Sequence, residues 1–241
     1  MIINKDSCLY NLPAGLALKD LLILDSIRFT IELIEHNYLS LYKELETISF
    51  NFENENYTRN LIPVFNNCWS LIDNCQRLIN QYKLLPSDND HQLIKEISYI
   101  TPLRNTFQHM DERINECLFE AEMPFYGVVS WEVKLTEGEM TQKFFLISSL
   151  YIPRGKLMHR VKKKENPKNI LVDISLETFI RKGRKPNVKF EKIDVNITRL
   201  FNQIISLIKQ FESKLDEVFM NQNATKTDWS KRRDIMLKIN Y

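Results

Sequence analysis

Residues 24–48 read LDSIRFTIELIEHNYLSLYKELETI, and the predicted fold starts from this stretch. Its apolar residues recur at alternating spacings of three and four, from Leu24 to Ile48. This heptad-like pattern places one apolar stripe along a long α-helix that packs nearly parallel to its neighbours. We therefore expect a long helix here, extended on its N-terminal side by residues 16–22. Residues 1–13 are expected to form a short leader.

Three further stretches have the same helical periodicity. They run from Leu61 to Tyr82, from Leu93 to Cys117 and from Ile197 to Val218. Pro102 interrupts the second of them, because proline lacks an N–H group and clashes with the preceding turn. We expect the helix to kink or restart there, with Thr101 as N-cap and Pro102 at the first helical position.

Between the last two helical stretches the apolar period changes to two, the period of a β-strand. The alternation covers residues 125–135, a hairpin turn is expected at 137–139, and the return strand runs over 140–152. The elements expected after it are a strand at 169–174, a short helix at 175–181 and a strand at 188–193.

These patterns predict an α+β fold that is mainly α. The expected architecture is an antiparallel four-helix bundle with a small antiparallel β-sheet inserted between the third and fourth helices. The helical domain would comprise residues 14–120 and 194–220, the β-insert residues 124–193, and a polar tail residues 221–241.

The composition of the 241 residues excludes several classes of protein. There are only five glycines, and neither a P-loop nor a dinucleotide-binding glycine motif occurs. The chain has no signal peptide pattern and no apolar run of transmembrane length, so we expect a cytoplasmic protein with no membrane association. The four cysteines do not have the spacing of a zinc site, and neither a metal nor a cofactor is expected.

Charge is distributed unevenly along the chain. The formal net charge is +2, but residues 151–192 contain thirteen Lys or Arg and four acids, a net charge of +9, which leaves −7 for the remainder. This basic insert has two interpretations: a nucleic-acid surface, or a solvated lysine-rich edge that keeps the sheet from aggregating. The residues predicted to bind nucleic acid are Arg154, Lys156, Arg160, Lys162, Lys163 and Lys164.

The densest group of chemically able side chains is Arg104-Asn105-Thr106-Phe107-Gln108-His109. On a straight helix Arg104 and His109 lie about 140° apart, whereas Asn105 and His109 share a face. Arg104 and His109 can therefore meet at one substrate only through a kink at Pro102 or through a second protomer. The other interpretation is a structural arginine beside a surface histidine.

The Arg104-Asn105-x-x-x-His109 motif, late in a helical bundle, resembles the R-x4–6-H motif of the HEPN superfamily (higher eukaryotes and prokaryotes nucleotide-binding domains). The resemblance covers roughly residues 16–118 and 194–220. It implies a dimeric, metal-independent ribonuclease of the toxin or defence type. Other members of the superfamily are binding or dimerisation modules with no demonstrated catalysis.

Metal-free RNA cleavage needs an acid or base that titrates near neutrality and positive charge beside the phosphate. The resemblance assigns catalysis to Arg104, Asn105 and His109, with Arg104 on the phosphate, His109 as general acid or base and Asn105 orienting. The expected partners are a second copy of the chain, RNA and an antitoxin-like protein. The alternative function is a non-catalytic helical module that binds a protein partner or dimerises.

Overall fold

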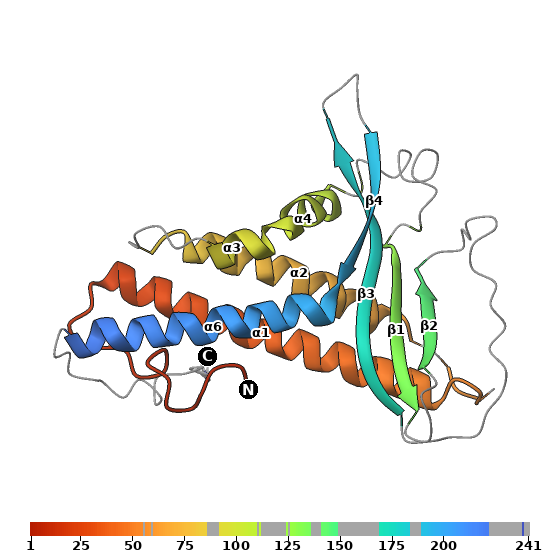
Figure 1. The fold of residues 1–241 in the computed structure, drawn as a ribbon, viewed down its shortest axis with the longest axis horizontal. Helices are drawn as coiled ribbons and strands as arrows, with labels where there is room; N and C mark the ends of the chain where they lie inside the picture. The colour runs from red at the N-terminus through yellow and green to blue at the C-terminus, as the bar shows by residue number, and fades with distance from the viewer. Residues whose placement is uncertain are drawn as a thin grey trace.

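The computed structural model describes residues 1–54, 56–58, 60–85, 92–109, 126–135, 141–148, 169–183 and 189–221, with the single residues 111, 124 and 238. The elements, in chain order, are α1 (Leu18–Phe50), α2 (Ile62–Tyr82), α3 (Gln92–Ile97), the 3-10 helix η1 (Ser98–Ile100), α4 (Thr101–Gln108), β1 (Val128–Leu135), β2 (Thr141–Ile147), β3 (Asn169–Lys182), β4 (Lys189–Asn196) and α6 (Ile197–Asn221). Figure 1 shows the long helices running alongside one another and the sheet standing across one end of them.

The long helices α1, α2 and α6 bury the apolar stripes that their sequences predict. In α1 Ile27, Ile31 and Ile34 are fully buried, and the stripe continues to Ile48. The rings of Tyr38 on α1 and Phe201 on α6 stack with their centroids 3.7 Å apart. These three helical predictions are confirmed, because a 3.6-residue period puts every stripe position on the face that the neighbouring helix covers.

The four strands form one antiparallel sheet in the order β2-β1-β3-β4. In β1 the side chains of Val129, Trp131 and Val133 are buried as predicted, but Val128 and Ser130 are buried as well, so the burial does not alternate strictly. Strand β4 runs directly into α6, where the side-chain oxygen of Asn196 accepts a hydrogen bond of 2.6 Å from the N–H group of Arg199. This is the bond that an N-cap residue makes, and it fixes where the sheet ends and α6 begins.

The sheet and the helices share one hydrophobic core. Its buried residues come from α1, α2, α6 and all four strands. The indole N–H of Trp131 on β1 donates a hydrogen bond of 2.7 Å to the hydroxyl of Ser49 on α1. Strand β3 contacts α1, α4 and α6. The apolar face of the sheet is therefore buried against the helices.

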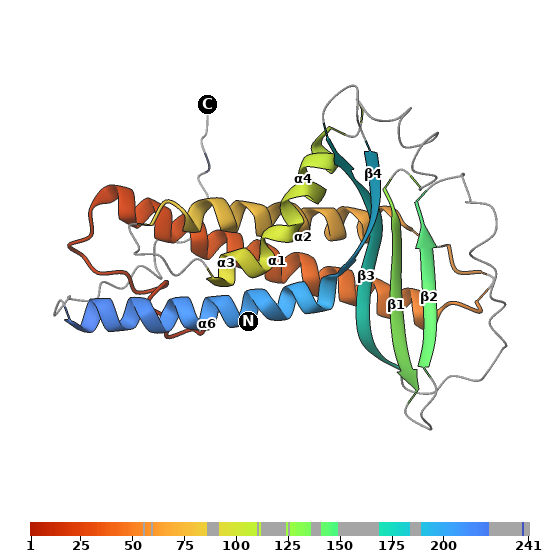
Figure 2. The same ribbon diagram turned by 45° about the horizontal axis from the view of Figure 1, so that its top comes forward.

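The predicted four-helix bundle with an inserted sheet was wrong. In the described part of the chain the segment expected as the third bundle helix is a bent series of short pieces, α3, η1 and α4. Figure 2 shows α4 turning from α3 towards β3, and the backbone N–H of Arg181 donates to the hydroxyl of Thr106. Apolar periodicity predicts which face of a helix or strand is buried, but it does not predict which element packs against that face. Here the sheet is a layer of the common core.

The short helix expected at residues 175–181 was also wrong. These residues continue β3, which pairs with β1 on one side and β4 on the other. Leu176, Thr178 and Ile180 are buried at a spacing of two. Phe179 is buried as well, so the burial pattern does not alternate strictly. Such a run is compatible with either a helix or a strand when only the sequence is known.

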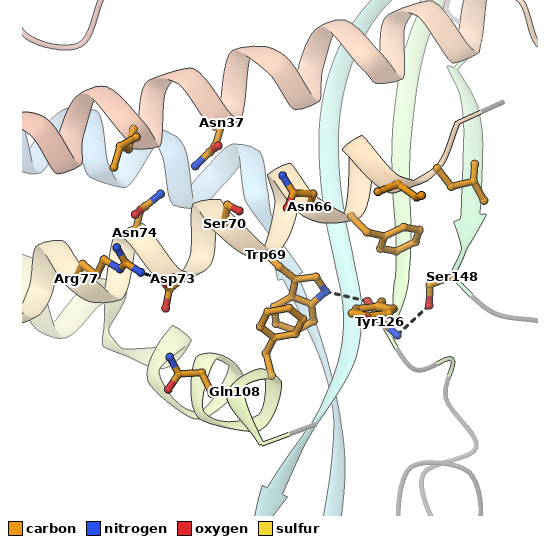
Figure 3. Close-up of a pocket in the computed structure, with 15 residues that line it drawn as sticks. Asn37, Asn66, Trp69, Ser70, Asp73, Asn74, Arg77, Gln108, Tyr126 and Ser148 are labelled. Carbon is orange, nitrogen blue, oxygen red and sulfur yellow. Dashed lines mark hydrogen bonds and ion pairs between the residues drawn. The ribbon is translucent and has the colours of Figure 1, made fainter. Parts of the chain in front are cut away.

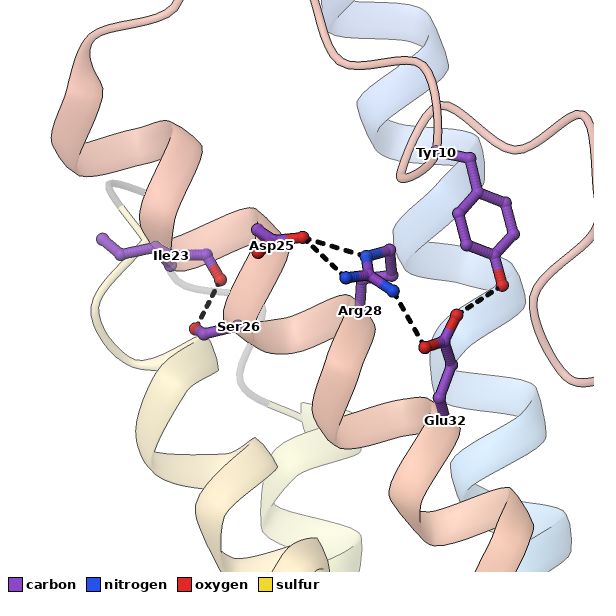
Figure 4. Close-up of polar contacts among 6 residues, drawn as sticks. All are labelled: Tyr10, Ile23, Asp25, Ser26, Arg28 and Glu32. Carbon is purple, nitrogen blue, oxygen red and sulfur yellow. Dashed lines mark hydrogen bonds and ion pairs between the residues drawn. The ribbon is translucent and has the colours of Figure 1, made fainter. Parts of the chain in front are cut away.

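The N-terminal segment, residues 1–12, packs onto the helices. Cys8 and Leu9 are buried in the common core. Figure 4 shows Arg28 of α1 between Asp25 and Glu32, and the hydroxyl of Tyr10 donating to Glu32 at 2.8 Å. The side chain of Arg28 is only 9% exposed, so the two carboxylates balance a largely buried charge. The bond from Tyr10 to Glu32 attaches the N-terminal segment to α1.

Candidate functional site

Arg104 lies in the first half of α4, the helix that restarts the chain at Pro102. The 3-10 segment η1 separates α3 from α4, and proline occupies the first turn of α4. The predicted restart is confirmed, although Thr101 does not cap the helix. Its hydroxyl donates a hydrogen bond of 2.6 Å to the side-chain oxygen of Gln76, which attaches the start of α4 to α2.

The three predicted catalytic residues have different environments. The Arg104 guanidinium faces α2, where its Nε lies 3.2 Å from a carboxylate oxygen of Asp73. Asn105 is exposed on α4. Helix α4 ends at Gln108, so exposed His109 lies just beyond the helix. Because His109 is outside the helix, its geometric relation to Arg104 differs from that expected on a straight helix. The catalytic roles of these residues stay predictions.

The six residues predicted to bind nucleic acid, from Arg154 to Lys164, lie outside the described residues. The same is true of most of the polar tail, and the predicted domain boundaries stay predictions.

A groove of about 1000 Å³ follows the exposed face of α2, with α1 on one side and α4 on the other. We call it the α2 groove. Figure 3 shows Asn37 of α1 and Asn66, Ser70 and Asn74 of α2 in the space between these helices, and Gln108 of α4 on the other side of α2. From Ile62 to Arg77 the lining spans fifteen helical steps, which is about 22 Å at 1.5 Å per residue.

Two buried carboxamides face the α2 groove. Asn37 is 8% exposed and Asn74 is 7% exposed, and both line the groove. Neither side chain has a hydrogen-bond partner among the described residues, and neither has a fully enclosed polar atom, so both amides reach the open space of the groove. These two side chains therefore have donors and acceptors available to a bound molecule.

Aromatic rings form the wall of the α2 groove on the α4 side. The rings of Trp69 and Phe107 are parallel within 8° and their centroids are 4.3 Å apart. The indole N–H of Trp69 donates a hydrogen bond of 3.1 Å to the backbone oxygen of Tyr126. The backbone N–H of Tyr126 in turn donates to the hydroxyl of Ser148. This chain of contacts fixes the wall at the junction of α2, α4 and the sheet.

The end of the α2 groove near Arg77 is charged. Both oxygens of the Asp73 carboxylate are engaged, one by Arg104 and the other by Arg77 at 2.8 Å. Two guanidinium groups thus share one carboxylate, which leaves a net charge of +1. The side chain of Arg77 is 61% exposed. The opposite end, formed by Leu61, Ile62 and Phe65, is apolar.

The cysteines of α2 do not contribute chemistry to the groove. Cys68 and Cys75 are fully buried on the face of α2 that packs in the core. Burial raises the pKa of the Cys68 thiol to about 12, and burial also raises the pKa of Cys75. Both side chains remain protonated at neutral pH and act as small apolar residues.

Comparisons of the chain with protein-family models, curated proteins and solved structures gave no match. Within the described ranges no helix is long and apolar enough to span a membrane. No cluster of three or more His, Cys, Asp or Glu suitable for a metal ion occurs among the same residues.

Sequence reasoning missed the α2 groove. The polar side chains of its floor, Asn66, Ser70, Asp73 and Arg77, recur at spacings of three and four on α2. This signal was visible, but any solvent-exposed helix face has the same polar period. Only the packing of α1 and α4 on either side turns this face into a groove.

Proposed function

We propose that this chain is a non-catalytic module that binds a segment of a partner protein in the α2 groove. The observation that supports the proposal best is the pair of carboxamides, Asn37 and Asn74, which are more than nine-tenths buried, face the groove and have no hydrogen-bond partner among the described residues. A side-chain amide presents a donor and an acceptor next to each other, which matches the N–H and C=O groups of a peptide bond.

The charge of the α2 groove favours a polypeptide over a nucleic-acid strand. The groove and its rim contribute two arginines and one aspartate. A polyanion needs several cations along its path, because phosphate neutralisation dominates its affinity. A peptide needs hydrogen bonds, apolar contact and at most one or two charges. RNA binding by the basic residues at 154–164 stays a separate prediction.

Substitution of Asn37 by leucine separates loss of binding from loss of folding. Leucine has a similar size and needs no partner, so Asn37→Leu should raise the free energy of unfolding by about 1–2 kcal/mol. The same change removes a donor and an acceptor from the α2 groove. We expect this variant to be more stable than wild type and weaker in binding.

The experiment is a selection of displayed random dodecapeptides on the wild-type chain, with counter-selection on Asn37→Leu. Selected peptides are then titrated calorimetrically into both proteins. Binding that falls at least about tenfold in the variant, together with a thermal midpoint no lower than that of wild type, supports the proposal. If no Asn37-dependent peptide emerges, the proposal fails, and Asn37-dependent binding of single-stranded RNA oligonucleotides would then assign the groove to RNA.

The ribonuclease hypothesis, with its dimer, remains a separate prediction. It requires Arg104 to exchange Asp73 for a phosphate and His109 to reach the same phosphate, within one chain or across two. Incubation of wild type and His109→Ala with RNA in EDTA tests it directly. Cleavage by wild type alone would support catalysis, and no cleavage by either protein would remove that role.

A further inference from the structure

The chemistry of the α2 groove changes along its length. Its apolar end consists of Leu61, Ile62 and Phe65, and Ile62 is 77% exposed. The carboxamides of Asn37 and Asn74 lie farther along, and the other end contains Arg77 and Asp73. Arg104 does not line the groove but binds the same Asp73 carboxylate from α4. A ligand that fills the groove therefore meets an apolar surface, then hydrogen-bonding groups, then a net positive charge.

We infer that the α2 groove binds an extended peptide segment of about seven residues, with an apolar side chain at one end and a carboxylate at the other. This inference rests on the proposed function. The length follows from the span of about 22 Å between Ile62 and Arg77, because an extended chain advances about 3.3 Å per residue. An α-helical segment would bond its own peptide groups and leave the buried carboxamides without partners.

The carboxamides would hold the backbone of the segment, which makes recognition along the middle of the groove independent of side-chain identity. Asn37 on α1 and Asn74 on α2 face the groove from two different helices. Each can donate to a peptide C=O and accept from a peptide N–H. Both are held in packed helices, so little conformational entropy is lost on binding.

The carboxylate would bind at the end where two guanidinium groups share one aspartate. Asp73 balances only one of the positive charges of Arg77 and Arg104. A ligand carboxylate supplies the second negative charge and accepts hydrogen bonds from the donors that Asp73 does not use. Because Arg77 is 61% exposed, we expect a modest gain in affinity from this contact.

The test uses two sets of synthetic heptapeptides with capped ends. Both sets have leucine at one end and alanine or serine in the middle, and each is made in both chain directions. One set has glutamate at the other end and the matched set has lysine. Fluorescence anisotropy of labelled peptides measures their affinity for wild type and for two variants, Arg77→Gln and Lys209→Gln. Lys209 is exposed on α6 and does not line the groove, so Lys209→Gln is the matched control.

Glutamate peptides should bind wild type about two to five times more tightly than lysine peptides, as is typical of a partly exposed ion pair. Arg77→Gln should abolish this preference, and Lys209→Gln should retain it. Methylation of the central peptide nitrogens should weaken binding to wild type, because it removes the N–H groups that donate hydrogen bonds to the carboxamide oxygens.

Equal binding of the two peptide sets, an unchanged preference in Arg77→Gln, or no binding by any heptapeptide would overturn the inference. The proposed function would still stand if Asn37-dependent dodecapeptides were recovered by display. If no peptide of either kind depended on Asn37, both the inference and the proposed function would fail.

Discussion

Trp131 provides the sharpest test of the finding that the sheet and the helices share one core. Its side chain on β1 is 2% exposed, its ring is parallel to Phe144 within 11° at 5.3 Å, and its indole N–H bonds to Ser49 on α1 at 2.7 Å. Trp131→Phe keeps an aromatic ring and removes the bond and part of the packed volume. A mutation in the sheet should then destabilise α1 as much as β1.

The free energy of unfolding that Trp131→Phe removes comes from the hydrogen bond to Ser49 and from the buried ring volume. The hydrogen bond contributes about 0.5–1.5 kcal/mol. Complete truncation of a buried tryptophan costs about 3–5 kcal/mol, and phenylalanine retains a large part of that burial. We expect Trp131→Phe to lower the free energy of unfolding by about 1–3 kcal/mol. Val172→Thr is the matched control, since Val172 is 46% exposed on β3, and surface changes stay within about 0.5 kcal/mol.

The assay combines urea unfolding, followed by circular dichroism at the helical band, with native-state hydrogen exchange of peptides from α1 and β1. Trp131→Phe should shift the helical transition to lower urea and reduce protection in both elements by the same free energy. An unchanged helical transition with reduced protection in β1 alone would show that the sheet unfolds independently. That result would refute the common core.

Three further predictions concern local structure. Gly127 has φ of 86°, and a Cβ there would collide with a neighbouring backbone oxygen. Gly127→Ala should therefore lower the free energy of unfolding, measured by urea titration, by about 2–4 kcal/mol. Gly15 has open space around it, so the control Gly15→Ala should change the same free energy by less than about 1 kcal/mol. Burial raises the pKa of the Cys68 thiol from 9.0 to about 12. Between these two values the unfolded chain loses the thiol proton and the folded chain keeps it, so stability should fall as pH rises from about 9 to about 12. A pH series that is no flatter for Cys68→Ala than for wild type would contradict the assignment. Asn196→Ala removes the hydrogen bond to Arg199 at the start of α6. It should lower the free energy of unfolding by about 0.5–2 kcal/mol and the thermal midpoint with it. An unchanged midpoint would exclude a capping role.

The local elements were largely determined by the sequence. The stripe from Leu24 to Ile48 predicts α1, because each of its positions returns to one face after three or four residues. The alternation around Trp131 predicts β1 for the corresponding reason with a period of two. Pro102 predicts the restart of α4, because the absent N–H and the ring act within a single turn. In each case the physical cause lies within a few residues of the feature that it determines.

The tertiary structure alone decided what covers each apolar face and what each polar group meets. The strand at residues 175–181 exists because β1 and β4 supply backbone partners on both sides. The surroundings of Arg104 follow from Asp73, thirty-one residues earlier in the chain. Asn37 and Asn74 become a candidate site only because α1 packs against α2. These contacts join residues far apart in sequence, and a periodic pattern contains no information about which distant element will pack against it.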